Sequence, residues 1–155
     1  MSLDQLEADR LLSMPKVFSE EVAQVDFPKF QTFEAEYALH GLGNREQFSL
    51  DLERGNRKRA RLKFQTRSRK IYILARIDIE GRPHRNPVDA PHRPNQRLVG
   101  THIHLYREGF ADRVAYLPED LPQFIAPAAN NDVSWLVAFL RFCNVVELPT
   151  IQEGI

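Results

Sequence analysis

The sequence KIYILARIDI, residues 70–79, decides the fold that this chain is expected to adopt. Isoleucine or alanine stands at every second position, and β-branched residues with this period favour a strand. Successive side chains of a strand point to opposite faces of its sheet, so these residues should share one apolar face. They are Ile71, Ile73, Ala75, Ile77 and Ile79. The segment therefore predicts a central strand with one side against the core.

Four further segments alternate apolar with polar residues and extend the prediction to a sheet. The first two are separated by a segment that contains the turn sequence RGNR (54–57), and so form a predicted hairpin. Residues 81–99 contain four prolines, which predicts a long loop before the fourth strand. The result is a five-stranded antiparallel meander over residues 48–117. Its predicted strands are residues 48–53, 59–67, 70–79, 101–107 and 113–117.

Helices are expected both before and after the strands of this sheet along the chain. Residues 19–39 carry apolar side chains at near-helical spacing among acids, which predicts amphipathic segments within a helical N-terminal part, residues 1–45. Residues 131–146 contain an apolar run after Asp132, a suitable N-cap, and predict a buried C-terminal helix. The predicted fold is α+β: the meander packed on N-terminal and C-terminal helices, in a single domain of residues 1–155.

The composition is that of a globular protein. The 155 residues are 43% hydrophobic and 27% charged, enough to form one core without disulfides. The single cysteine, Cys143, lies in an apolar run, which indicates a buried thiol in a reducing compartment. The acidic N-terminal segment does not resemble a signal peptide, and no run approaches the ~18 apolar residues of a membrane span. We expect a cytoplasmic protein that is not inserted in a membrane.

Charge is segregated along a chain whose formal net charge is zero. Residues 54–107 hold fifteen Lys and Arg against three acids, a net charge of +12, so the rest of the chain carries the balancing −12. Either acids elsewhere in the fold neutralise the basic strands, or the sheet presents an electropositive surface to a polyanion, RNA in particular. The basic residues predicted to contact nucleic acid are Arg57, Lys58, Arg59, Arg61, Lys63, Arg67 and Arg76.

The polar face of the fourth predicted strand carries a second candidate feature. His102, His104 and Tyr106 alternate there with apolar residues and should lie together. RNA cleavage without a metal or other cofactor needs a base for the 2′-hydroxyl, an acid for the leaving oxygen and cations for the phosphorane. These three residues are therefore the candidate catalytic residues of a metal-independent endoribonuclease, with Arg61 and Arg76 supporting the phosphate.

Two alternatives stay open from the sequence. His102, His104 and Glu108 share strand parity and could form a two-histidine, one-carboxylate site for a divalent metal ion, the kind that holds iron or manganese in enzymes. In the other alternative the basic face docks on an acidic protein, as a non-catalytic inhibitor or an antitoxin-like partner would. The sequence does not determine the oligomeric state.

Five short motifs between the first predicted strand and the C-terminal helix carry a family resemblance. They are SLDLERG (49–55), IDI (77–79), HRNP (84–87), GTHIHLYREG (100–109) and FCN (142–144). Through them the chain resembles a family of small bacterial and phage proteins classed as a domain of unknown function. The resemblance implies a mobile-element, toxin–antitoxin or phage-defence setting, and no site residue carries over from it.

Overall fold

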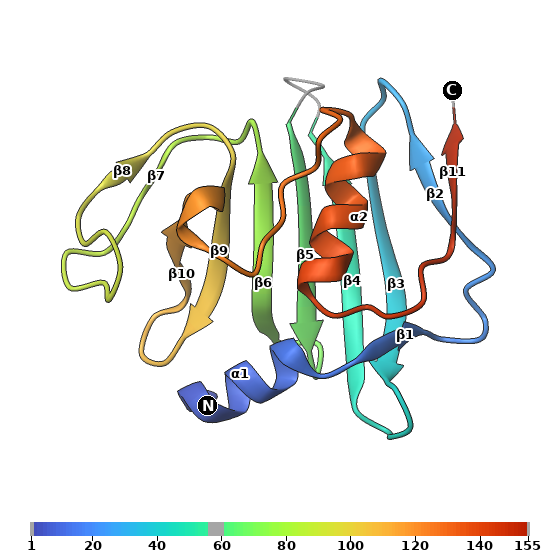
Figure 1. The fold of residues 1–155 in the computed structure, drawn as a ribbon, viewed down its shortest axis with the longest axis horizontal. Helices are drawn as coiled ribbons and strands as arrows, with labels where there is room; N and C mark the ends of the chain where they lie inside the picture. The colour runs from blue at the N-terminus through green and yellow to red at the C-terminus, as the bar shows by residue number, and fades with distance from the viewer. Residues whose placement is uncertain (1, 56–60, 155) are drawn as a thin grey trace.

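A seven-stranded sheet organises the computed structural model, which describes residues 2–55 and 61–154 (Figure 1). The strand order is β1-β3-β4-β5-β6-β9-β10, and every neighbouring pair is antiparallel. The predicted meander is confirmed in outline, but it has seven strands rather than five. The strands are β1 (Lys16–Phe18), β3 (Phe33–Gly41), β4 (Gln47–Arg54), β5 (Leu62–Ser68), β6 (Tyr72–Ile79), β9 (His102–Arg107) and β10 (Ala111–Tyr116).

Two short strand pairs lie beyond the ends of this sheet. At one end, β2 (Gln24–Pro28) pairs in parallel with β11 (Thr150–Gly154). At the other, β7 (His84–Arg85) pairs with β8 (Arg97–Leu98) (Figure 1). The proline-rich segment between β6 and β9, predicted as a loop, therefore contains a small antiparallel pair of its own.

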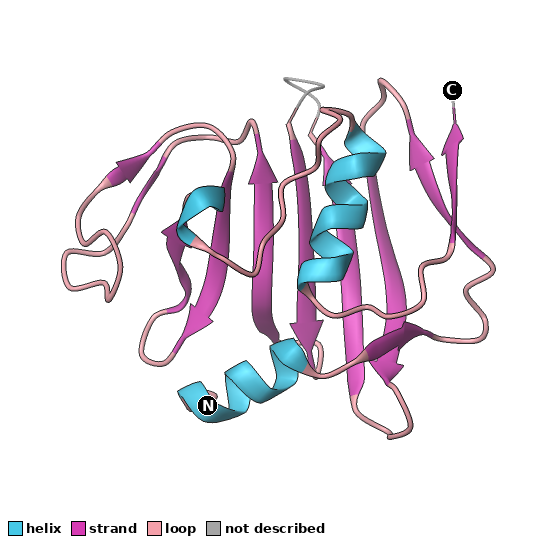
Figure 2. Ribbon diagram, in the orientation of Figure 1, coloured by secondary structure: helices cyan, strands magenta, loops and turns pink. Residues whose placement is uncertain are grey.

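The described part of the chain has two α-helices, α1 (Gln5–Ser13) and α2 (Asp132–Phe142), and a short 3-10 helix, η1 (Pro118–Asp120). The predicted C-terminal helix is confirmed as α2, but its N-cap is Asn131, whose side chain accepts a hydrogen bond from the Ser134 N–H. Figure 2 shows α2 lying over one face of the sheet. The shorter helix, α1, lies near the ends of β6 and β9. Neither helix is long and apolar enough to span a membrane.

The prediction of helices within residues 19–39 was wrong. This region forms β2 and most of β3, and the helix near the N-terminus, α1, precedes it. In β3 the sequence FEAEYAL alternates apolar with mostly acidic residues, and its side chains alternate between half-buried and exposed. The period of two prevailed over the near-helical spacing because β3 pairs along its whole length with β4.

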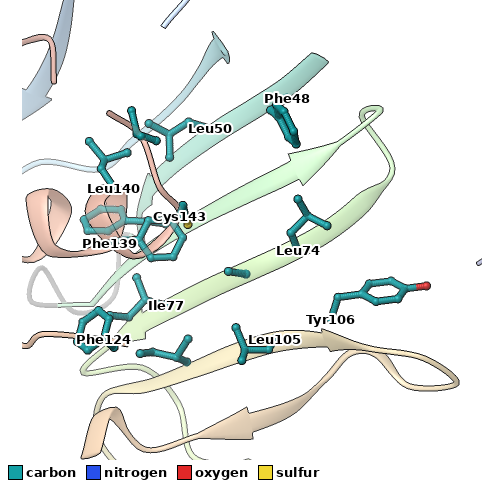
Figure 3. Packing of buried hydrophobic residues seen from close by; sticks show 14 of the residues in the cluster. Phe48, Leu50, Leu74, Ile77, Leu105, Tyr106, Phe124, Phe139, Leu140 and Cys143 are labelled. Atoms are coloured by element: carbon teal, nitrogen blue, oxygen red, sulfur yellow. The ribbon is translucent and has the colours of Figure 1, made fainter. Parts of the chain in front are cut away.

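The apolar face of the sheet packs against α2. Leu50, Phe64 and Ile77 come from three successive strands and are fully buried, as the alternation predicted. Leu140 and Phe139 of α2 cover them, with the Phe64 and Phe139 ring centroids 6.3 Å apart (Figure 3). Burial of such side chains stabilises the fold by about 1.5–3 kcal/mol each. The opposite face of the sheet remains available for polar groups.

A β-bulge in β6 corrects the predicted row of isoleucines. The register against β5 slips by one residue between Ile73 and Ala75, which leaves Leu74 as the extra residue. Before the bulge the parity is reversed, so Tyr72 and Leu74 are buried while Ile71 is 65% exposed. A strict period of two does not reveal a bulge, because the inserted residue is itself apolar.

One buried cation, Lys16, joins the ends of both helices to the sheet. Its side chain is 0% exposed, and Nζ donates hydrogen bonds to the carbonyl oxygens of Leu12 (2.7 Å), Met14 (3.1 Å) and Cys143 (2.8 Å). These carbonyls lie at the C-terminal ends of α1 and α2, where a helix dipole favours positive charge. Burial lowers the pKa of Lys16 to about 8.

Candidate functional site

A pocket of about 580 Å³ opens on the face of the sheet opposite α2, beside β5, β6 and the segment that follows β6. Its volume lies within the roughly 300–1,000 Å³ of small-molecule sites. Cations outnumber acids in the lining, and the imidazoles of His84 and His102 also contribute. The charged lining residues are Glu53, Arg61, Lys63, Arg76, Asp78 and Arg82.

Beside this pocket, His102 and His104 lie next to each other on β9, each only 1% exposed. The Nδ1 atom of each lies 2.9 Å from a backbone carbonyl oxygen, that of Gly100 for His102 and that of Asp112 for His104. A carbonyl only accepts hydrogen bonds, so both Nδ1 atoms carry a proton, and Nε2 is the nitrogen that keeps the lone pair in each neutral ring. The two Nε2 atoms face Asp78 Oδ2, at 3.7 Å from His102 and 3.9 Å from His104.

Arg76 holds the aspartate and one of the histidines. Its Nε lies 2.8 Å from Asp78 Oδ1, its Nη2 lies 3.1 Å from Asp78 Oδ2, and its Nη2 donates to His104 Nε2 at 3.0 Å. The buried Nε2 of His102 has no hydrogen-bond partner within the described ranges. A buried polar atom in this state costs about 1–3 kcal/mol, so it calls for an explanation.

The electrostatics of the cluster leave the His104 imidazole uncharged and the Asp78 carboxylate ionised. Burial, and then the adjacent Arg76 charge, lower the pKa of His104 to about 3, so this histidine is neutral at physiological pH. Burial raises the pKa of Asp78, but the hydrogen bonds and charge of Arg76, with help from the histidines, bring it below its ordinary value. His104 therefore has no proton on Nε2 to donate.

A third imidazole, His84 of β7, packs against the pair. Its ring centroid lies 4.6 Å from that of His104 and 6.0 Å from that of His102. Its Nε2 lies 2.9 Å from the Arg113 carbonyl oxygen and donates to it. His84 was not among the predicted site residues, although the HRNP motif of the family resemblance begins with it.

Only two of the three predicted catalytic residues come together in the structure. Tyr106 belongs to the hydrophobic core cluster (Figure 3). Its ring packs edge-on against that of Tyr72, with centroids 6.3 Å apart. Its hydroxyl accepts a hydrogen bond from the Leu3 N–H at 2.8 Å. This placement does not support a role for Tyr106 beside His102 and His104.

The carboxylate beside the histidines is Asp78, not the predicted Glu108. Glu108 follows the end of β9, and its Oε1 accepts from the Gln5 N–H (2.9 Å) at the start of α1. Asp78 was missed because it belongs to β6, where the β6–β9 register sets it directly opposite His102. The potential metal-ligating atoms of Asp78, His102 and His104 all lie within 4.8 Å of one another. A two-histidine, one-carboxylate arrangement is thus present with a different carboxylate.

Acids within the fold pair with most of the described basic residues that were predicted to contact nucleic acid. Arg67 Nε lies 2.6 Å from Asp51 Oδ2, and Lys63 Nζ lies 3.6 Å from Glu53 Oε2. Arg76 is held by Asp78, as described above. Charge segregation along the sequence is therefore largely balanced in space by neighbouring strands.

Arg61 and Arg82 differ from these residues. Within residues 2–55 and 61–154, neither makes an ion pair or a hydrogen bond, and both line the pocket. Arg82 is exposed, whereas Arg61 is half-buried and its Nε is fully buried without an acceptor. Among the described residues, the pocket therefore contains guanidinium groups without a partner that can bind an anion. The other three residues predicted to contact nucleic acid, Arg57, Lys58 and Arg59, lie outside the described residues.

Comparison with known proteins confirms the coarser part of the resemblance. No curated protein and no solved structure matches the chain. A family model does match, over residues 3–145, a range that contains both helices, the seven-stranded sheet and the pocket. The chain therefore belongs to this family, which is described as a family of unknown function (DUF6978).

Proposed function

We propose that this protein acts on nucleic acid, RNA in particular, and that its pocket binds a phosphate group. The observation that carries the proposal is Arg61, a half-buried guanidinium that lines the pocket with a buried, unpartnered Nε among the described residues. A phosphate oxygen is the acceptor that a guanidinium binds with the best geometry. Arg82 supplies a second guanidinium in the same pocket.

The dimensions and lining of the pocket favour a single strand of RNA. A volume of about 580 Å³ accommodates one nucleotide but no duplex. Single-stranded RNA presents unstacked nucleotides that enter such pockets, whereas duplexes are contacted mainly across their grooves. Glu53 supplies a carboxylate in the lining that can accept a hydrogen bond from a 2′-hydroxyl, a group that DNA lacks.

Proton transfer to or from RNA by the predicted set of His102, His104 and Tyr106 receives no support from the geometry. His104 is neutral and its Nε2 already accepts a hydrogen bond from Arg76. Tyr106 lies in the core with its hydroxyl on the Leu3 amide. Binding by the pocket arginines is therefore the function that the site supports best, and the mobile-element, toxin–antitoxin or phage-defence setting stays a prediction.

Fluorescence anisotropy with labelled single strands of RNA and DNA of one sequence tests this proposal. We expect RNA to bind more tightly than DNA, with an affinity that falls as salt concentration rises. Arg61→Gln and Arg82→Gln should each weaken RNA binding on the order of tenfold, about 1.4 kcal/mol. Arg141→Gln is the matched control, because this exposed arginine lies on α2, on the other side of the sheet.

Two results would contradict the proposal. One is the absence of salt-sensitive binding, and the other is an Arg61→Gln variant that binds RNA as the Arg141→Gln variant does. Retention of an acidic protein partner that RNA does not displace would instead favour the protein-docking alternative.

A further inference from the structure

RNA binding by the arginines leaves the arrangement of Asp78, His102 and His104 unexplained. Two histidine Nε2 atoms face one carboxylate oxygen at 3.7 and 3.9 Å. Because Nδ1 of each ring donates to a main-chain carbonyl, Nε2 is the atom that carries the lone pair of the neutral imidazole. Lone pairs that converge in a buried site repel one another unless a cation lies between them. The Arg76 guanidinium is such a cation, because its Nη2 donates to both His104 Nε2 and Asp78 Oδ2. His102 has no such partner in the part of the chain that the structure describes.

We propose that Asp78 Oδ2, His102 Nε2 and His104 Nε2 bind one divalent transition-metal ion. Ligands of zinc lie about 2.0–2.2 Å from the ion, which sets neighbouring donors about 3.3 Å apart in a tetrahedron. The two separations from Asp78 Oδ2, 3.7 and 3.9 Å, are a few tenths of an ångström longer, and all three atoms lie within 4.8 Å of one another, so metal binding requires them to move closer together. Two imidazoles with one carboxylate suit zinc, iron, cobalt or manganese, whereas magnesium and calcium prefer all-oxygen sites.

The surroundings of the two imidazoles also fit this role. Histidine ligands of metals usually donate their second ring nitrogen to a carbonyl or carboxylate, which fixes the tautomer and the ring orientation. His102 donates to the Gly100 carbonyl, and His104 donates to that of Asp112. Both bonds are to the main chain, so the Nε2 atoms are held toward Asp78 by the fold itself.

Arg76 competes with the metal for the same atoms. Its Nη2 lies on Asp78 Oδ2 and His104 Nε2, so the metal must displace it. The side chain is 21% exposed and has other partners, Asp78 Oδ1 (2.8 Å) and Asp112 Oδ2 (3.2 Å), that can retain it nearby. Arg76 thus balances the buried carboxylate without metal and lowers the apparent metal affinity.

Three protein ligands leave a coordination position open for water or substrate, as in catalytic zinc sites. His102 also lines the pocket that contains Arg61 and Arg82. A phosphate oxygen held by these arginines would therefore lie beside the metal, which polarises phosphoryl oxygens. This last step rests on the proposed function, whereas metal binding does not.

Metal titration in the absence of nucleic acid tests the site. Protein dialysed against a chelator is titrated with Co²⁺, followed by visible absorption, and with Zn²⁺ against a chromophoric chelator. We expect one equivalent to bind with a dissociation constant of about 1 μM or less, and Asp78→Asn and His104→Ala to weaken binding by about 100-fold or more. His92→Ala is the matched control. His92 also lies beside an aspartate that is paired with an arginine, Asp120 with Arg93, but no second histidine of the described residues hydrogen-bonds to that aspartate.

Arg76→Gln should tighten Zn²⁺ binding by about tenfold, because it removes the competing cation. Zn²⁺ should also shift the Nε2 resonances of His102 and His104, but not that of His92, in ¹⁵N NMR spectra of the folded wild-type protein. Substoichiometric binding, or equal affinity in Asp78→Asn and wild type, would overturn the site. If His104→Ala does not fold, as judged by circular dichroism, the Asp78→Asn and NMR results decide. Weaker Zn²⁺ binding by Arg76→Gln than by wild type would show that Arg76 does not compete with the metal. None of these measurements depends on RNA.

Discussion

Two clusters in this protein combine an aspartate with an arginine and histidine, and they are completed differently. At Asp120, Arg93 donates through Nε (2.7 Å) and Nη2 (2.8 Å), and His92 Nε2 lies within hydrogen-bond distance, 2.9 Å from Oδ2. At Asp78, Arg76 donates in the same two-pronged way. The two histidine Nε2 atoms there, however, stop at 3.7 and 3.9 Å from the carboxylate.

The difference separates a stabilising cluster from a ligand-binding one. Asp120 Oδ2 also accepts from the Leu117 N–H, and the cluster holds η1 against the segment between β7 and β8. The hydrogen bond from Arg93 is the main cause that holds the pKa of Asp120 well below its usual range. The Asp78 cluster instead leaves His102 Nε2 buried and unpaired among the described residues. A cluster in which every polar atom has a partner within the protein stabilises the fold. A buried polar atom without a partner instead indicates that the cluster can bind a ligand.

Lys16 is the centre of a third cluster, in which every hydrogen-bond acceptor of Nζ is a main-chain carbonyl oxygen. Its substitution is expected to have the largest effect on stability. Lys16→Met fills the same space but leaves three carbonyl oxygens without their donor. We expect the free energy of unfolding to fall by about 3 kcal/mol or more, measured by urea denaturation. Lys29→Met, at an exposed ion pair, is the control and should change it by less than about 1 kcal/mol. A Lys16→Met variant as stable as this control would show that the buried cation does not stabilise the fold.

Matched substitutions of the two aspartates give the next largest effect. Asp120→Asn removes the charge that binds Arg93 and His92, and we expect a loss of about 2 kcal/mol. Asp78→Asn loses the charge that binds Arg76 but gains an amide N–H that can donate to a histidine Nε2, so its cost should be below about 1 kcal/mol. Urea denaturation of both variants with a chelator present checks this order. The reverse order would mean that the Asp78 cluster is the more important one for the fold.

The sheet was largely predictable from the sequence because alternation reports burial on one face directly. The apolar rows of β4, β5 and β9 were correct, whereas Ile71 was misassigned because the bulge at Leu74 reverses the parity of β6. The segment of β3 was read as helix because its apolar residues fit both periods, and only pairing with β4 decides between them.

The candidate site was predictable in part. His102 and His104 were found from their alternation on one strand. Asp78 was not, because its approach to them depends on β6 pairing with β9 across the intervening residues 80–101. Tyr106 was included because it shares their parity, but the N-terminal segment covers it through the Leu3 amide. Contacts between distant segments cannot be derived from the local period of either one.

The titration of Lys16 gives the smallest expected effect, and it is the most specific test of the cluster of carbonyl oxygens around Lys16. The pKa of Lys16 is lowered to about 8 in the folded protein, whereas an unfolded lysine keeps its proton to about pH 10.4. Above pH 8 the unfolded chain therefore binds more protons than the folded one, so the free energy of unfolding rises with pH.

Burial raises the pKa of the Cys143 thiol to about 11, whereas an unfolded thiol has a pKa of about 8.5, so Cys143 acts in the opposite direction from about pH 8 upward. The Lys16 contribution is therefore taken as the difference between wild type and a Lys16 variant over pH 8 to 9. We expect the stability of wild type relative to Lys16→Met, which contains the same thiol, to rise by about 1 kcal/mol across this window, measured by urea denaturation at each pH. The same pH profile in both proteins would mean that the three carbonyl oxygens keep Lys16 protonated across this window, and any pH dependence would then belong to another group.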